Sequence, residues 1–156
     1  MKNSKGFTLI EVIVTMVFIG IMVTIAGISL VSASRNAELR SVAQEMYGQF
    51  QRAKIEAIKR NQPVAIVFSP PTRYQVFVDP NNDKILDAGE TVLSDITVKH
   101  GIEFPAANIT FPTANKTGFT PRGRPSGGAG TVVINNTVTT KSFQLTTSIS
   151  GYVHLQ

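Results

Sequence analysis

The chain is 156 residues long, which is about the size of one domain and leaves no room for a second. It contains no cysteine, so disulfide bonds, thiolate nucleophiles and cysteine-ligated metals are excluded. The formal net charge of +5 is too small an excess to indicate nucleic-acid binding by itself.

The apolar residues are concentrated in one N-terminal segment. Residues 7–31 contain a single charged side chain, Glu11, and as an α-helix they would extend roughly 37 Å. A hydrocarbon core is ~30 Å thick, so the segment predicts a membrane-spanning helix. The alternative is a cleaved secretory signal, because Ser32, Ala33 and Ser34 resemble a cleavage site, but the apolar region of such a signal is only about 7 to 15 residues long.

Charged residues predict the orientation of this segment. Lys2 and Lys5 precede it with no acidic residue between them, and basic residues are retained on the cytoplasmic side of a membrane. The rest of the chain is therefore expected outside the cytoplasm. A carboxylate such as Glu11 is costly near a membrane, so it either snorkels to water or pairs with a positive charge from another subunit.

A short motif surrounds the start of the apolar segment. It consists of Lys5, Gly6, Phe7, Thr8, Leu9, Ile10 and Glu11. In this order the residues resemble the prepilin signature of type IV pilins and type II secretion pseudopilins. The resemblance implies that a prepilin peptidase cleaves after Gly6 and methylates the new N-terminal residue, Phe7. It also implies that Glu11 offsets the N-terminal amine of a neighbouring subunit during assembly.

Elementary electrostatics assigns Glu11 the same role. An isolated amine and an isolated carboxylate are each costly in hydrocarbon, and pairing them between subunits relieves both costs. The segment departs from many pilins at residues 26–29, where Ala-Gly-Ile-Ser stands in place of a helix-bending proline. Gly20 and Gly27 would still permit local unwinding of a helix.

Between residues 34 and 62 the chain is more polar but keeps a helical period. Apolar side chains recur every three or four residues at Leu39, Val42, Met46, Phe50, Ala53 and Ala57. This stripe predicts an amphipathic helix that continues the membrane helix as one rod and packs on a globular head. Asn61 and Pro63 are expected to end it. The charged residues outside the stripe are expected to be solvated or to form salt bridges between subunits.

After Pro63 the period changes to two, which predicts short antiparallel strands. The predicted strands are residues 64–68, 74–78, 91–93, 96–104, 109–111, 131–135, 142–147 and 152–155. The predicted fold class is therefore α+β, with a long N-terminal helix, transmembrane in its first half, packed on a small antiparallel β-sheet head. The predicted segments are a cleaved cytoplasmic leader (1–6), a membrane and filament-core helix (7–33), an amphipathic helix (34–62) and a periplasmic β-rich head (63–156).

Two further segments indicate which subfamily the chain resembles. Residues 119–128, which read Phe-Thr-Pro-Arg-Gly-Arg-Pro-Ser-Gly-Gly, and residues 150–153, which read Ser-Gly-Tyr-Val, are similar to segments of the GspH/FimT family of minor pseudopilins. Together with the N-terminal motif, the resemblance covers essentially the whole chain.

One loop has the spacing of a calcium-binding loop. Oxygen-bearing side chains stand at loop positions one, three, five, nine and twelve, namely Asp79, Asn81, Asp83, Asp87 and Glu90. Lys84 stands where such a loop normally has glycine at its sharp turn, and no flanking helices are expected. The alternative is a polar hairpin connection rich in turn-forming residues. Apart from calcium, no cofactor is predicted.

Arg122 and Arg124 are candidate nucleic-acid contacts, because they carry positive charge and precede a glycine-rich stretch. Some relatives of the family resemble DNA-uptake subunits, whose proposed DNA contact is a C-terminal Gly-Arg-x-Arg motif. Residues 151–154 of this chain read Gly-Tyr-Val-His at the matching place, so DNA is disfavoured as a partner. The alternative for Arg122 and Arg124 is a solvated loop.

The leading functional hypothesis is a non-catalytic minor pseudopilin of a type II secretion pseudopilus or type IV pilus. Its expected partners are the prepilin peptidase, other pilins or pseudopilins, the assembly platform and the bacterial inner membrane, which it would cross once with its head in the periplasm. One rival is a DNA-binding minor pilin of a competence system. The other is a membrane-tethered hydrolase, which is disfavoured because no recognisable motif places a nucleophile beside a base.

Overall fold

The computed structural model describes residues 7–156, apart from the side chains of residues 25–29. Its helices are α1 (Leu9–Arg60) and the short 3₁₀-helix η1 (Ala106–Asn108). The strands are β1 (Val64–Ser69), β2 (Arg73–Val78), β3 (Val92–Thr97), β4 (Ile102–Glu103), β5 (Lys116–Phe119), β6 (Gly130–Asn136), β7 (Ser142–Thr147) and β8 (Val153–Leu155). The chain divides into two compact units, the N-terminal unit (Met1–Arg35) and the globular unit (Asn36–Gln156).

The described part of the N-terminal unit is helical from Leu9 onward. The amide of Glu11 donates hydrogen bonds to the carbonyl oxygen of Thr8 (3.1 Å) and to its Oγ1 (3.4 Å), so Thr8 caps the first turn. The hydroxyl groups of Thr15 and Thr24 donate to carbonyl oxygens of the preceding turn, at 2.8 and 2.9 Å. These hydroxyls are therefore satisfied inside the helix and require no external partner.

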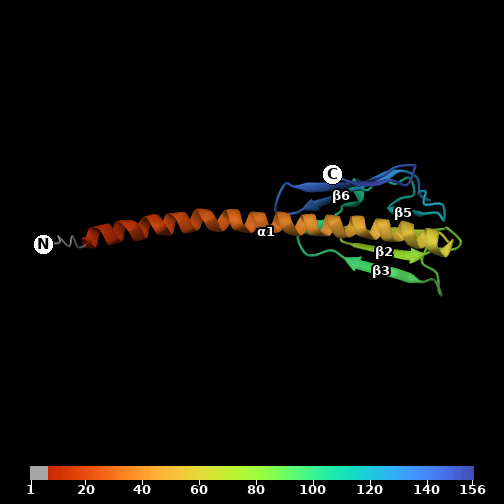
Figure 1. The fold of residues 1–156 in the computed structure, drawn as a ribbon, viewed down its shortest axis with the longest axis horizontal. Helices are drawn as coiled ribbons and strands as arrows, with labels where there is room; N and C mark the ends of the chain where they lie inside the picture. Colours follow the sequence, from red (N-terminus) through yellow and green to blue (C-terminus); the bar gives the residue numbers. More distant parts are fainter. Residues whose placement is uncertain (1–6) are drawn as a thin grey trace. The chain divides into compact units, whose positions relative to one another are not determined.

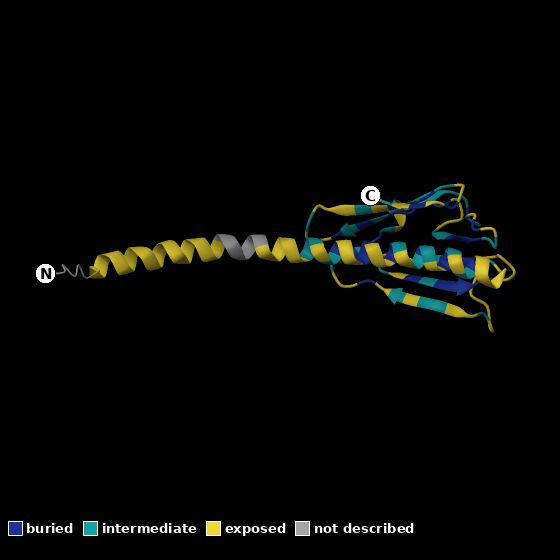
Figure 2. Ribbon diagram, viewed as in Figure 1, coloured by how far each residue is buried: buried dark blue, intermediate teal, exposed yellow. Residues whose placement is uncertain are grey.

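In the globular unit, one face of α1 is buried and the opposite face is exposed (Figure 2). The buried side chains include the whole predicted stripe of Leu39, Val42, Met46, Phe50, Ala53 and Ala57. The helix ends at Asn61, whose φ of 51° is left-handed. The amide of Asn61 bonds to Ile58 O and that of Gln62 bonds to Ala57 O, which together form a Schellman cap. The predicted stripe and stop signal are both confirmed.

Two four-stranded antiparallel sheets pack against this part of α1. The first sheet has the order β3-β2-β1-β5 and the second has the order β4-β6-β7-β8. Figure 1 shows β2 and β3 on one side of the helix and β6 on the other. The α+β class, with a long N-terminal helix and antiparallel sheets, is confirmed.

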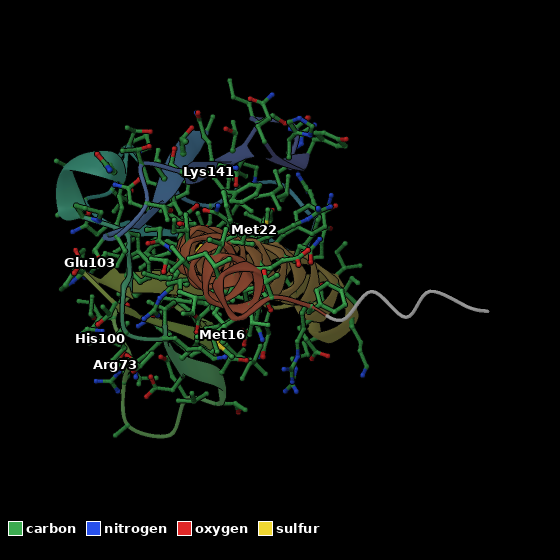
Figure 3. The ribbon with its side chains drawn as sticks, turned by 90° about the vertical axis from the view of Figure 1, so that its left-hand side faces the viewer. Met16, Met22, Arg73, His100, Glu103 and Lys141 are labelled. Carbon is green, nitrogen blue, oxygen red and sulfur yellow. The ribbon has the colours of Figure 1, made fainter. Side chains whose placement is uncertain are left out.

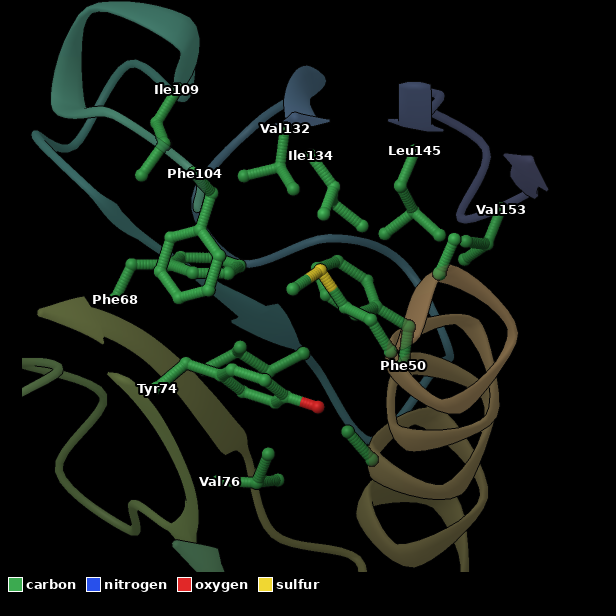
Figure 4. Close-up of a cluster of buried hydrophobic side chains, with 14 of the residues drawn as sticks. Phe50, Phe68, Tyr74, Val76, Phe104, Ile109, Val132, Ile134, Leu145 and Val153 are labelled. Atoms are coloured by element: carbon green, nitrogen blue, oxygen red, sulfur yellow. The ribbon is translucent and has the colours of Figure 1, made fainter. Parts of the chain in front are cut away.

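The hydrophobic core lies where α1 and the two sheets meet. Phe50 projects from α1 into this region (Figure 4), and its ring centroid lies 6.2 Å from that of Phe68, 6.5 Å from Phe111 and 6.3 Å from Phe119. Tyr74 contributes from β2, and its burial, reinforced by the charge of Glu45, raises its pKa. Aromatic side chains from the helix, the first sheet and a connecting loop therefore fill one continuous core together with aliphatic side chains of the second sheet.

Three strand predictions differ from the observed structure. Residues 91–93 and 96–104 were expected to form two strands with a break between them, but residues 92–97 form the single strand β3 of the first sheet, and the chain turns at Gly101 (φ 91°) before β4 of the second sheet. Residues 109–111 form no strand, and Ile109 makes only an isolated bridge with Val132. The sequence analysis also missed β5, a four-residue strand that pairs with β1.

We predict that Phe50→Ala lowers the free energy of unfolding of the globular unit by about 3–5 kcal/mol, because it leaves a cavity among three aromatic rings. Urea unfolding of the full-length chain in detergent, followed by near-UV circular dichroism, measures the change. Ile55→Ala on the same helix is the matched control, since Ile55 is 60% exposed and its truncation should cost less than about 0.5 kcal/mol. Equal losses in the two variants would contradict this account of the core.

Candidate assembly interface and ligand sites

The N-terminal unit exposes an unusually large apolar surface. The large apolar side chains from Phe7 to Val23 are between 42% and 82% exposed. Met16 and Met22 point to different sides of the helix (Figure 3), so the apolar surface is not confined to one stripe. A soluble monomer rarely exposes such a surface, which indicates that lipid or other protein helices cover it.

Over the part of the chain that the structure describes, no helix combines the length and the hydropathy needed to cross a membrane. The predicted membrane helix at residues 7–33 includes residues 25–29, whose side chains lie outside that part. The membrane span stays a prediction.

The residues of the N-terminal motif lie partly within the described structure. Gly6, the predicted cleavage site, lies outside the described residues. Phe7 is 82% exposed, and Glu11 lies in the first turn of α1 with an exposed side chain. No ion pair with Glu11 occurs within residues 7–156, apart from the undescribed side chains.

The predicted calcium loop is closed by its own hydrogen bonds. Asp79 is only 1% exposed, and its carboxylate accepts hydrogen bonds from the amides of Asp83 (3.2 Å) and Lys84 (3.0 Å). Lys84 adopts a left-handed φ of 60°, the conformation for which glycine is preferred at this position. The backbone therefore makes the sharp turn without glycine.

The other predicted calcium ligands bond to one another. The Asn81 Nδ2 donates to Asp83 (3.0 Å) and Asp87 (3.1 Å), and the Glu90 carboxylate accepts from the amide of Asp87 (3.0 Å). Among the described residues, no three acidic or histidine side chains lie close enough together to hold a metal ion. Calcium binding by this loop stays a prediction.

We predict that Asp79→Ala lowers the free energy of unfolding by about 1–3 kcal/mol, because it removes the acceptor for two backbone amides. Asp87→Ala is the control, since the Asp87 carboxylate accepts only from the exposed Asn81 amide and its loss should cost less. Thermal unfolding with and without calcium measures both effects. A calcium-dependent stabilisation that disappears in both variants would support the calcium interpretation, and equal calcium-free losses would contradict the role of Asp79.

Arg122 and Arg124 lie on an exposed loop beside the C-terminal end of α1. Together with Asn61, Thr120, Pro121 and Pro125 they line a cavity of about 680 Å³. Neither arginine forms an ion pair within the described residues. The cavity therefore presents two uncompensated positive charges, which suits an anionic partner.

Two glycines attach this loop to the rest of the globular unit. Gly123 has φ 73°, and a Cβ there would lie 3.1 Å from Lys54 Cε and 3.2 Å from Ile58 Cδ1 on α1. Gly151 has φ 81°, and a Cβ there would overlap the carbonyl oxygen of Gly123. Lys54 Nζ also donates a 2.9 Å hydrogen bond to Gly151 O. The two segments that resemble the GspH/FimT family thus pack on each other and on α1.

Two surface features were missed by the sequence analysis. The rings of Tyr152 and His154 stack at 6.2 Å on the outer face of β8 and line a cavity of about 480 Å³. The alternation of these residues with buried Val153 is the signal that would have revealed them.

On the first sheet, Arg73 donates hydrogen bonds of 2.8 and 2.6 Å to Asp95, which lowers the pKa of Asp95 to about 2.

Comparison with known families identifies two matching regions. Residues 42–151 match the family described as Type II transport protein GspH. Residues 1–27 match the Prokaryotic N-terminal methylation motif. No curated protein matches the chain.

Solved structures share the fold at low sequence identity. The type IV minor pilin FimU of Pseudomonas aeruginosa is 18% identical, with a TM-score of 0.58 over 78% of this chain and 90% of that chain. The minor pseudopilin EpsH from the Type 2 Secretion System of Vibrio cholerae is 17% identical, with a TM-score of 0.56 over 76% of this chain and 96% of that chain. These likenesses extend across most of both chains and establish a common fold.

Proposed function

The chain belongs to the Type II transport protein GspH family, and from this premise we propose that it is a non-catalytic minor pseudopilin of a type II secretion pseudopilus or a type IV pilus. The observation that carries the proposal is the combination of a family match over the globular unit with an N-terminal methylation motif. The exposed apolar helix supports it, because such a surface is suited to packing against the helices of other subunits.

The proposed maturation takes place at the membrane. The prepilin peptidase cleaves after Gly6 and methylates Phe7, which leaves the apolar helix at the N-terminus of the mature chain. Before assembly this helix crosses the inner membrane once, with Lys2 and Lys5 on the cytoplasmic side and the globular unit in the periplasm. The assembly platform then transfers the subunit into a filament.

Glu11 sets the register of the proposed assembly, which is the stagger of one subunit's helix along the next. Its carboxylate is unpaired within the described part of this chain and lies in an apolar surface, where an uncompensated charge is costly. The freed amino group of Phe7 in a neighbouring subunit supplies a positive charge at the same depth in the packed helices. Pairing these two groups satisfies both charges only when the helices are correctly staggered.

We predict that Glu11→Ala weakens association with other pilins or pseudopilins at least tenfold. Breaking a fully buried ion pair costs about 3–5 kcal/mol, and partial hydration of the remaining amine would reduce that cost. Co-purification from detergent-solubilised membranes, with intact mass analysis of the mature N-terminus, measures assembly and processing together. Glu11→Asp should restore part of the association. Glu45→Ala, which removes an exposed carboxylate from the same helix, is the control.

Unchanged association of the Glu11→Ala variant would remove the electrostatic basis of the proposal. A mature chain that begins anywhere other than at methylated Phe7 would count against the proposed processing. Secretion and piliation that both survive deletion of the chain would contradict the function itself.

A second candidate is a DNA-binding minor pilin of a competence system, and the two unpaired arginines at the 680 Å³ cavity favour it. If it is correct, Arg122→Ala/Arg124→Ala should weaken binding of duplex DNA and reduce the slope of log affinity against log salt by about two. Fluorescence anisotropy over a salt series measures both. Lys59→Ala/Arg60→Ala removes the same charge from the end of α1, and an equal effect there would show that binding is non-specific.

A further inference from the structure

A second basic cavity lies at the start of the globular unit. It has a volume of about 320 Å³ and is lined by Asn36, Ala37, Leu39, Arg40, Lys141 and Phe143. The first four of these residues belong to α1, and the other two lie at the turn between β6 and β7 and at the start of β7. Figure 3 shows Lys141 on the side of the second sheet, away from Arg73 on the first sheet and from His100 in the turn between β3 and β4.

Local hydrogen bonds hold the β6–β7 turn against α1 at this cavity. The Asn136 Oδ1 accepts from the amides of Val138 (2.9 Å) and Thr139 (3.0 Å), which fixes the turn. Thr139 Oγ1 then donates a 3.1 Å hydrogen bond to Asn36 Oδ1 on the helix. The position of Lys141, two residues further on, is therefore set by contacts to the same helix that carries Arg40.

The wall of the cavity is apolar, whereas its rim is positively charged. Phe143 is half-buried against the core and Ala37 is exposed on α1, so both present hydrocarbon surface, with the fully buried Leu39 behind them. Arg40 and Lys141 are exposed. Neither of them forms an ion pair among the described side chains.

No acidic neighbour neutralises this rim from the same face of the helix. Glu38 is the nearest acidic residue in sequence, and it pairs with Lys99 at 3.7 Å. Glu38 and Arg40 are two positions apart, about 200° around a helix, which places them on roughly opposite sides of it. The cavity is thus complementary to a group with negative charge and attached hydrocarbon.

The sequence places this cavity next to the predicted membrane segment. The apolar run ends at Val31; Asn36 follows after about 7.5 Å of helix and Arg40 after about 13.5 Å. Lipid phosphates lie in the interfacial layer just outside the hydrocarbon core. A chain inserted as proposed therefore brings the Asn36 end of the cavity to the headgroup region, and the long side chain of Arg40, which tilts toward the N-terminus of the helix, extends toward the phosphates.

We propose that this cavity binds the headgroup of an anionic phospholipid, with Arg40 and Lys141 contacting the phosphate and with Ala37 and Phe143 contacting the adjoining glycerol and acyl carbons. This inference rests on the proposed membrane insertion and goes beyond the assembly role. The bound lipid would hold the base of the globular unit at the membrane surface until the subunit is extracted into a filament.

Native mass spectrometry of the purified full-length chain in mild detergent tests the proposal, with dioleoyl phosphatidylglycerol as the anionic probe and dioleoyl phosphatidylcholine as the zwitterionic one. Each cation close to an anionic headgroup contributes about fivefold, so Arg40→Gln/Lys141→Gln should weaken phosphatidylglycerol binding roughly 25-fold. Arg40→Lys/Lys141→Arg should retain the binding. The matched control is Arg122→Gln/Arg124→Gln, which removes two exposed, unpaired cations from the other basic cavity.

Four outcomes would overturn the proposal. The first is that the native chain binds both lipids equally. The second is that the two glutamine double variants lose phosphatidylglycerol binding equally. The third is that free glycerol phosphate displaces the lipid at equal concentration, which would identify a site for soluble phosphate. The fourth is that Arg40→Gln/Lys141→Gln leaves lipid binding unchanged but abolishes co-purification with other subunits. That result would assign the cavity to an acidic surface of a neighbouring subunit.

The measurement separates this proposal from the proposed function. It uses the isolated chain, so it requires no assembly partner. Glu11→Ala should retain the lipid preference while losing association. Failure of lipid binding in a chain that still assembles would overturn the lipid site alone.

Discussion

The structure depends on one constraint, which is that an apolar helix surface must be covered. In the globular unit, α1 meets this constraint internally, because two sheets bury the stripe that includes Leu39 and Phe50. In the N-terminal unit, the apolar side chains from Phe7 onward are exposed, and the described chain offers nothing to cover them. The same helix thus stabilises one fold and requires an external partner. This requirement, more than any cavity, is what indicates a role in assembly.

In the proposed assembly, Glu11 turns non-directional apolar packing into a specific arrangement. Burial of apolar surface alone is roughly proportional to area and tolerates sliding of one helix along another. A charge in that surface is tolerated only where an opposite charge stands at the same depth, so it penalises every other stagger. The hydroxyls of Thr15 and Thr24 exert no such control, because they are already satisfied by backbone carbonyls of their own helix. Glu11 is therefore the residue best suited to define register.

The sequence predicted the parts of the fold that follow from local periodicity. The stripe of α1, its cap at Asn61 and the hairpin of β1 and β2 depend on neighbouring residues and were found correctly. Strand β5 was missed because its four residues include Gly118 and show little alternation, and pairing with β1 decides its conformation. The basic cavity at Arg40 and Lys141 was missed for a related reason. It joins positions about a hundred residues apart, and no local pattern connects them.

The segments that resemble the family at residues 119–128 and 150–153 are explained by packing. Gly123 and Gly151 lie where side chains would collide with α1 or with each other, and Lys54 links the helix to the terminal segment. These glycines therefore specify how the loop docks and do not themselves indicate a ligand. The arginines on either side of Gly123 are exposed and line the cavity. A fixed loop with free charges at its surface can change partners by substitution at Arg122 and Arg124 alone, because the docking residues are separate from the exposed ones.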